Sequence, residues 1–191
     1  MECFSWKKII TVPALFVLLF LLVQPALAEN EERYTKFNVH AQSKTGSMAN
    51  ASYANYTNPG AGHVIVPAGT QIVITKKSRK KFVFTYDDGG KKVTFEYHQP
   101  RMGMSLDEYL DKITSLEPTS PAGLSSLDRK GVAAGKALVG MSREGVMTAL
   151  GYPAAHRTPS LDMSTWVYWT NRFKTLAVEF DDRGKVVNVR Y

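Results

Sequence analysis

Cysteine and long apolar segments are both scarce in this chain of 191 residues. Its single cysteine, Cys3, stands ahead of an apolar run at residues 9–23. No later stretch approaches the roughly 20 apolar residues that a membrane-spanning helix needs. We therefore expect the chain that remains after export to have no disulfide, no thiol nucleophile and no cysteine for a lipid anchor.

Catalytic and metal-binding motifs are missing as well. The four histidines form no His-x-x-x-His pair and have no carboxylate at metal-ligand spacing. There is no Gly-x-Ser-x-Gly elbow and no phosphate-binding glycine loop. The acidic pairs at 87–88 and 181–182 stand beside glycine, where turn formation accounts for them. We expect a protein that is not an enzyme and that has neither a metal nor a cofactor.

The residues around the apolar run indicate a secretory signal peptide. Lys7 and Lys8 precede the run, and the small residues Ala26 and Ala28 follow it where signal peptidase cleaves. We expect residues 1–28 to be removed, with an uncleaved anchor as the alternative. The protein would then be exported, and periplasmic or peripherally associated with the outer membrane. It would stay basic, since the whole chain carries a formal charge of +7.

Clusters of β-branched and aromatic residues predict an antiparallel β-meander within residues 63–116. The expected strands are residues 64–66, 71–75, 82–86 and 93–97. Apolar residues alternate along the last three, so one face of the meander would be apolar. Ser105 and Glu108 fit a capping box at the start of an amphipathic helix, which we expect to cover that face.

The rest of the chain completes an α+β prediction. Residues 29–62 are polar and small, which predicts one edge strand at most, and the prolines of residues 117–126 predict a linker. Residues 127–191 predict a small domain: a helix capped by Ser142, then three antiparallel strands at 165–170, 175–180 and 185–189. Gly151 and Pro153 supply the stop signal for the helix.

Several motifs of this C-terminal segment occur in a specific order. They are Gly140-Met141-Ser142, Leu150-Gly151-Tyr152-Pro153, Trp166-Val167-Tyr168 and a final hairpin through Gly184-Lys185-Val186-Val187. In this order they resemble the SmpA/OmlA (BamE-like) outer-membrane assembly domain over residues 127–191. The resemblance implies a two-layer domain that binds other proteins at the outer membrane, assists β-barrel assembly and carries out no catalysis. Gly145 departs from the family, which tends to place Gln or Glu there.

Aromatic residues on both faces of the strand at 165–170 suggest a partner-binding surface. Alternation puts Trp166 and Tyr168 on one face and Trp169 on the other, so one large aromatic must lie away from the helix-covered core. An exposed aromatic near an arginine is typical of a binding hot spot. The predicted surface consists of Arg157, Trp166, Tyr168, Trp169, Arg172 and Phe173. The alternative is that the N-terminal domain covers the second face.

A dense basic cluster predicts a second surface, at a hairpin tip. It consists of Lys76, Lys77, Arg79, Lys80 and Lys81, which would suit anionic lipid, acidic polysaccharide or an acidic protein. The alternative is a solvated tip that protects a sheet edge. Nucleic acid is a poor partner, because the chain is exported and no aromatics interleave with these cations.

These observations favour a non-enzymatic binding or scaffolding module of the cell envelope. Its partners would be envelope proteins. The family resemblance implies that these include the barrel-assembly machinery. Two alternatives remain at this level: an SH3-like protein that binds peptidoglycan, and a periplasmic enzyme inhibitor.

Overall fold

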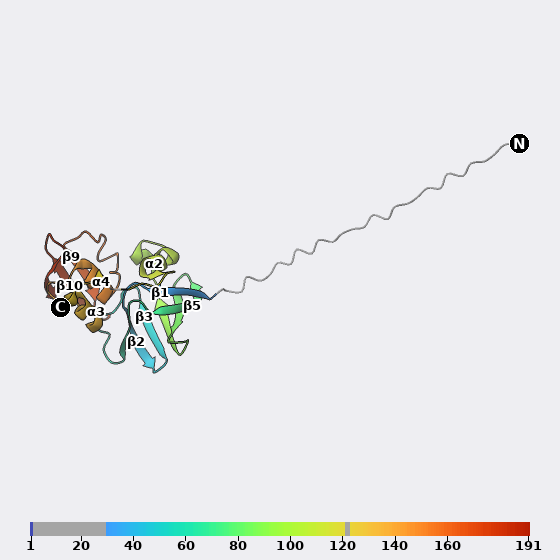
Figure 1. Cartoon of the computed structure of the whole chain (residues 1–191), viewed down its shortest axis with the longest axis horizontal. Coiled ribbons are helices and arrows are strands. Elements are labelled where there is room, and N and C mark those ends of the chain that lie inside the picture. The colour runs from blue at the N-terminus through green and yellow to red at the C-terminus, as the bar shows by residue number, and fades with distance from the viewer. Residues whose placement is uncertain (2–29, 121–122) are drawn as a thin grey trace.

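The computed structural model describes residue 1 and residues 30–120 and 123–191, so the predicted signal peptide lies outside the described residues. This part of the chain contains one eight-stranded sheet, one three-stranded sheet and four helices. Figure 1 shows two packed units, with α3, α4 and the second sheet on one side of the large curled sheet. Within the described ranges, no helix combines the length and apolarity needed to cross a membrane.

The large sheet curls into a half-barrel of mixed strands. In spatial order its strands are β4 (His63–Val66), β2 (Val39–Thr45), β3 (Met48–Ser52), β7 (Lys91–Glu96), β6 (Lys81–Tyr86), β5 (Gln71–Ser78), β1 (Glu31–Thr35) and β8 (Thr114–Ser115). Strands β3 and β7 run parallel, whereas the other neighbours are antiparallel.

The predicted fold class is wrong for this unit. Residues 30–62 supply three strands of the half-barrel instead of a mostly irregular segment. Strand β4 pairs with β2 at one sheet edge and not with β5, so the strands after residue 63 do not form a simple meander. The buried positions of β2 and β3 include Ala41 and Ala51, and alanine has a low preference for strands. The composition of residues 30–62 therefore did not indicate these strands.

The predicted apolar face does form the core of this unit. Its residues are Ile72, Ile74, Phe82, Phe84, Phe95 and Tyr97, each at most 3% exposed. Helix α2 (Leu106–Ile113) begins with the predicted capping box and packs Tyr109 against this face. The ring centroid of Tyr109 lies 5.1 Å from that of Tyr97. A single-turn helix, α1 (Gln99–Met102), precedes α2.

The C-terminal unit packs two helices against the three-stranded sheet. Its elements are α3 (Ser126–Ala134), α4 (Arg143–Leu150), β9 (Thr165–Trp169), β10 (Thr175–Phe180) and β11 (Val186–Arg190), with sheet order β11-β10-β9. The three strands and the Ser142 cap occur where the sequence predicted them. The sequence did not predict helix α3. Its glycine and charged residues interrupt the helical spacing of apolar residues.

Gly145 is explained by a neighbouring helix. The Asp128 carboxylate of α3 accepts a hydrogen bond of 2.7 Å from the Ser142 backbone N–H at the start of α4. An added Cβ at position 145 would collide with this carboxylate. In a capping box, a Glu or Gln at position 145 would accept a hydrogen bond from the Ser142 backbone N–H. In this protein Asp128 accepts that hydrogen bond instead.

Asn38 joins the two units at the C-terminal end of α4. Its backbone N–H donates to Thr148 O at 2.8 Å, and its side-chain amide donates to Val132 O at 2.8 Å and Ala149 O at 3.2 Å. Its amide oxygen accepts from Ala68 N–H at 3.0 Å. The last carbonyls of a helix have no partner within that helix, so these bonds supply an end cap from the other unit.

His40 and Asn55 complete this cap. His40 Nε2 lies 2.9 Å from Ala149 O, and the Asn55 amide donates to Leu150 O. Because a carbonyl can only accept, His40 carries a proton on Nε2. Its Nδ1 lies 3.0 Å from His63 Nε2. Burial lowers the pKa of His40, so the ring is neutral at pH 7 and its Nδ1 is an acceptor for His63.

Replacing Asn38 by Ala should weaken the whole fold. The substitution removes three side-chain hydrogen bonds and leaves buried backbone groups unpaired, so we expect the free energy of unfolding to fall by about 2–3 kcal/mol. Urea denaturation measures the change. Asn50→Ala, at an exposed position of β3, is the matched control and should alter stability by less than about 0.5 kcal/mol. Equal effects of the two substitutions would contradict the end-cap account.

Acid should destabilise the protein through His40. Burial is the main cause that lowers the pKa of His40 from 6.5 to about 4. In the unfolded chain His40 takes up a proton near pH 6.5, whereas in the fold it stays neutral until about pH 4. Its contribution is therefore complete above pH 6.5 and is lost as the pH falls toward 4, by up to roughly 3 kcal/mol.

The His40→Gln variant tests this pH dependence. Glutamine retains an amide donor for Ala149 O but does not titrate. Denaturation curves between pH 7.5 and 4 should show a shallower loss of stability in the variant, with the burial-lowered pKa of His63 accounting for part of what remains. Parallel curves for the two proteins would show that His40 does not cause the loss.

Candidate functional site

Trp169 lies where the two units meet. Alternation along β9 buries Trp166 and Tyr168 in the C-terminal core, each 1% exposed, and directs Trp169 to the opposite face. There Trp169 packs, half-buried, against the core of the half-barrel. Its carbonyl accepts from Thr57 N–H at 2.9 Å, which fixes the strand to the loop after β3. Of the predicted aromatic surface, Trp166 and Tyr168 are thus unable to contact a partner.

A pocket of about 610 Å³ opens beside Trp169, and we call it the junction pocket. Its lining residues are Ser52, Tyr53, Ala54, Tyr56, Glu96, Arg101, Trp169 and Arg172. They come from the end of β3 and the loop after it, the end of β7, α1, and the end and turn of β9. Its volume is within the range of about 300–1,000 Å³ that is typical of ligand sites.

The charged residues of the junction pocket are free of ion pairs. Within residues 30–120 and 123–191, Arg101, Arg172 and Glu96 make none of the salt bridges, and all three are exposed. Arg101 donates from Nη1 to the Tyr53 hydroxyl at 2.6 Å, which orients its guanidinium. With two cations and one carboxylate, the pocket favours an anionic occupant.

Two buried polar atoms of this pocket have no partner. Among the described residues, the buried side-chain atoms without a hydrogen bond are Ser52 Oγ and Trp169 Nε1, and both residues line the junction pocket. A buried polar group without a partner costs about 1–3 kcal/mol. Both atoms are fully buried, so they strain the free protein but do not themselves offer hydrogen bonds to a molecule in the pocket.

Aromatic and histidine rings surround the pocket. The ring centroid of Tyr53 lies 5.8 Å from that of His98, and His156 stacks 6.5 Å from Trp169. The Arg157 guanidinium lies 5.7 Å from the Trp169 ring. Burial, followed by the charges of Arg101 and Arg157, lowers the pKa of His156, so this ring is neutral at pH 7. The same burial effect raises the pKa of the Tyr56 hydroxyl, which keeps its proton.

The predicted basic cluster is only partly a hairpin tip. Lys76 and Lys77 belong to β5, and Lys77 is ion-paired with Glu31 and Asp107, each at 3.2 Å. Arg79 and Lys80 form the turn, and the basic residues other than Lys77 make no salt bridge within the described ranges. Lys77 therefore has a structural role, and the other cations remain open to a ligand.

The two predicted surfaces prove to be neighbours. A second hollow of about 780 Å³, which we call the tip hollow, is lined by Arg79, Lys80, Glu96, Tyr97, His98, Gln99, Pro100 and Gly103. Glu96 lines both this hollow and the junction pocket. Strand pairing places Lys81 opposite Glu96 in the half-barrel. The basic tip and Trp169 thus border one continuous surface.

At the tip of the β9–β10 hairpin, Phe173 is exposed. Its side chain is 85% accessible, and the Arg172 guanidinium lies 5.9 Å from its ring. Arg157, Trp169, Arg172 and Phe173 of the predicted aromatic surface therefore reach the pocket region or solvent. Sequence reasoning missed Tyr53, Tyr56, Glu96 and Arg101, because most of them lie in segments without a recognisable motif.

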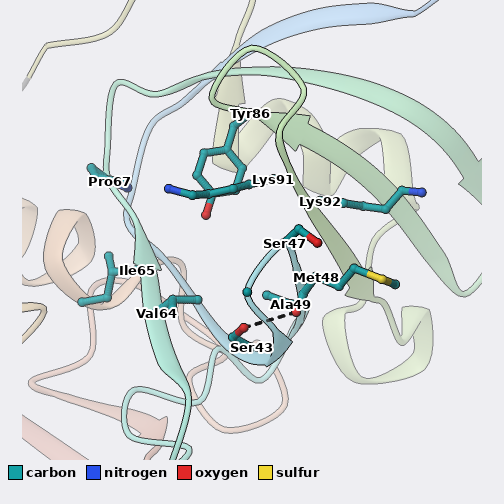
Figure 2. A pocket seen from close by; sticks show the side chains of 11 residues that line it. Ser43, Ser47, Met48, Ala49, Val64, Ile65, Pro67, Tyr86, Lys91 and Lys92 are labelled. Atoms are coloured by element: carbon teal, nitrogen blue, oxygen red, sulfur yellow. Dashed lines mark hydrogen bonds between the residues drawn. The ribbon is translucent and has the colours of Figure 1, made fainter.

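A further hollow of about 450 Å³ is lined by residues of β2, β3, β4, β6 and β7 and the turns next to them. Figure 2 shows Tyr86 and Val64 approaching it from different strands. Its cation Lys91 is paired with Asp87 at 3.0 Å and lies over the Tyr86 ring. Its other cation, Lys92, makes no salt bridge among the described residues, but Tyr86 is the one aromatic residue of the lining, so this hollow is a weaker candidate for a protein partner than the junction pocket.

Comparison with known proteins adds no relative: no family model, curated protein or solved structure matches this chain. The SmpA/OmlA resemblance of residues 127–191 therefore rests on the sequence motifs alone and stays a prediction. Among the residues that the structure describes, no three His, Cys, Asp or Glu side chains gather in a group that could hold a metal ion.

Ser52→Ala should stabilise the protein in the absence of ligand. The substitution removes a buried hydroxyl that has no partner, so we expect the free energy of unfolding to rise by up to about 1 kcal/mol. Ser43→Ala is the matched control, since Ser43 Oγ donates to Thr45 O at 2.7 Å and its loss should lower stability slightly. A destabilising effect of Ser52→Ala in urea denaturation would show that this hydroxyl is already satisfied.

Proposed function

We propose that this protein is a non-enzymatic binding module of the cell envelope, which docks a partner protein at the junction of its two units. The observation that carries the proposal is the junction pocket. There two arginines without ion-pair partners and three aromatic side chains converge. Trp, Tyr and Arg are the residues that dominate binding energy at protein interfaces.

The rigidity of the junction supports this role. Trp169 is held by the Thr57 hydrogen bond and by packing on the half-barrel, and Arg101 is oriented by Tyr53. Side chains that are already positioned lose little conformational freedom when a partner binds. Phe173 extends the surface beyond the pocket with an apolar contact.

The envelope setting rests on the sequence. The predicted signal peptide supports export, and the SmpA/OmlA resemblance supports a partner within the barrel-assembly machinery. The exposed hairpin of residues 171–174 belongs to the segment that carries this resemblance, so this part of the proposed docking surface lies in the same unit as the family motifs.

Photo-crosslinking in living cells tests the proposal. A photoreactive amino acid at Arg172 or Phe173 should capture the same envelope protein, because both residues border the docking surface. The same amino acid at Lys130, on the exposed part of α3, is the control and should capture no such protein. Mass spectrometry of the adducts identifies the partner, and barrel-assembly subunits are the expected product.

Two results would contradict the proposal. Equal capture from all three positions would mean that the hairpin is not a preferred surface. Sedimentation of the purified protein with isolated sacculi, without any added protein, would favour the peptidoglycan-binding alternative instead.

A further inference from the structure

We infer that the junction pocket and the tip hollow together bind an acidic, extended peptide segment of the partner. This inference rests on the proposed function and names the chemistry of the bound segment. It differs from the two sequence predictions, which treated the aromatic surface and the basic cluster as separate sites. The structure joins them at Glu96.

The charges of the joined surface favour carboxylates. Arg101 and Arg172 line the junction pocket, and Arg79 and Lys80 line the tip hollow. None of these four cations has an ion-pair partner in the ranges 30–120 and 123–191. Hydrogen bonds from a guanidinium to a carboxylate are about twice as strong as neutral ones, and they select for negative charge. A segment with spaced acidic residues would therefore meet one cation pair in each hollow.

The hydrogen-bonding groups favour a peptide over a simple anion. Glu96 can only accept, whereas the Tyr53 and Tyr56 hydroxyls can both donate and accept. An inorganic anion offers acceptors alone and would be repelled by Glu96. A peptide backbone offers a carbonyl and an N–H at each residue, so it can meet all three groups while its side-chain carboxylates meet the arginines.

The walls of the pocket also suit a peptide. Tyr53, Tyr56 and Trp169 provide apolar ring surface beside the cations, and Phe173 is exposed on the adjoining hairpin. Successive side chains of an extended segment point to opposite faces, so apolar and acidic side chains that both face this surface would recur at every second residue. The apolar ones would bury against these rings. An acidic glycan has carboxylates and can stack its sugar rings on aromatic rings, but it has no apolar side chains that could fill the pocket beside them.

Fluorescence anisotropy with the purified exported protein tests the inference. The probe is a fluorescein-labelled peptide with the repeat Glu-Ser-Leu-Ser, which places Glu and Leu on one face of an extended chain. The comparison ligands are the matching Gln-Ser-Leu-Ser peptide and labelled oligogalacturonate. We expect the acidic peptide to bind at least about tenfold more tightly than either. The R101Q/R172Q and R79Q/K80Q double variants should each weaken its binding by about tenfold, and more salt should weaken it further.

Control variants separate charge from folding. K44Q/K130Q removes two exposed lysines outside both hollows and should bind like the unmodified protein. R101K/R172K keeps the charge but not the planar fork, so it should lie between the unmodified protein and R101Q/R172Q. Thermal unfolding of every variant shows whether a loss of binding reflects a loss of fold.

The outcomes are distinct. Equal binding of the Glu and Gln peptides would overturn the inference, and so would tighter binding of oligogalacturonate, which would indicate an acidic glycan. Loss of binding in only one double variant would overturn the joint use of the two hollows. If crosslinks form at Phe173 but the acidic peptide binds no better than the neutral one, the proposed docking function stands and the peptide chemistry is wrong.

Discussion

The architecture depends on how the C-terminal end of α4 is capped. A helix leaves its last carbonyls without internal partners, and burying them unpaired would be costly. In this protein Asn38, His40 and Asn55 of the half-barrel supply the missing donors. The two units are therefore bound by directional contacts, in addition to the apolar packing of Trp169, and their relative orientation is defined.

The junction pocket is a consequence of this docking. The cap places β9 beside the loop after β3, where Thr57 bonds to the Trp169 carbonyl. The same docking brings Arg172 of the second sheet to the same pocket as Arg101 of α1. Neither unit alone has both arginines, so the site belongs to the assembled chain. A small disturbance of the cap would accordingly displace the binding surface as well as weaken the fold.

The pocket also shows a conflict between stability and binding. Ser52 Oγ and Trp169 Nε1 are buried without partners among the described residues, which is unfavourable for the free protein. The two arginines are exposed and make no salt bridge within the described ranges, so they are hydrated in the free protein and available to a partner.

The sequence by itself determined the elements with strong local signals. The Ser105 and Ser142 caps, the period-two aromatic face and the three C-terminal strands all follow from contacts between near neighbours. The tertiary structure alone decided the mixed sheet, the place of β4 beside β2, and the meeting of Trp169 with Arg101. These depend on pairing between distant segments, such as β3 with β7, and the small residues of β3 carry no strong local preference for a strand. Local patterns predict which segments become strands and helices, whereas long-range packing decides which of them meet.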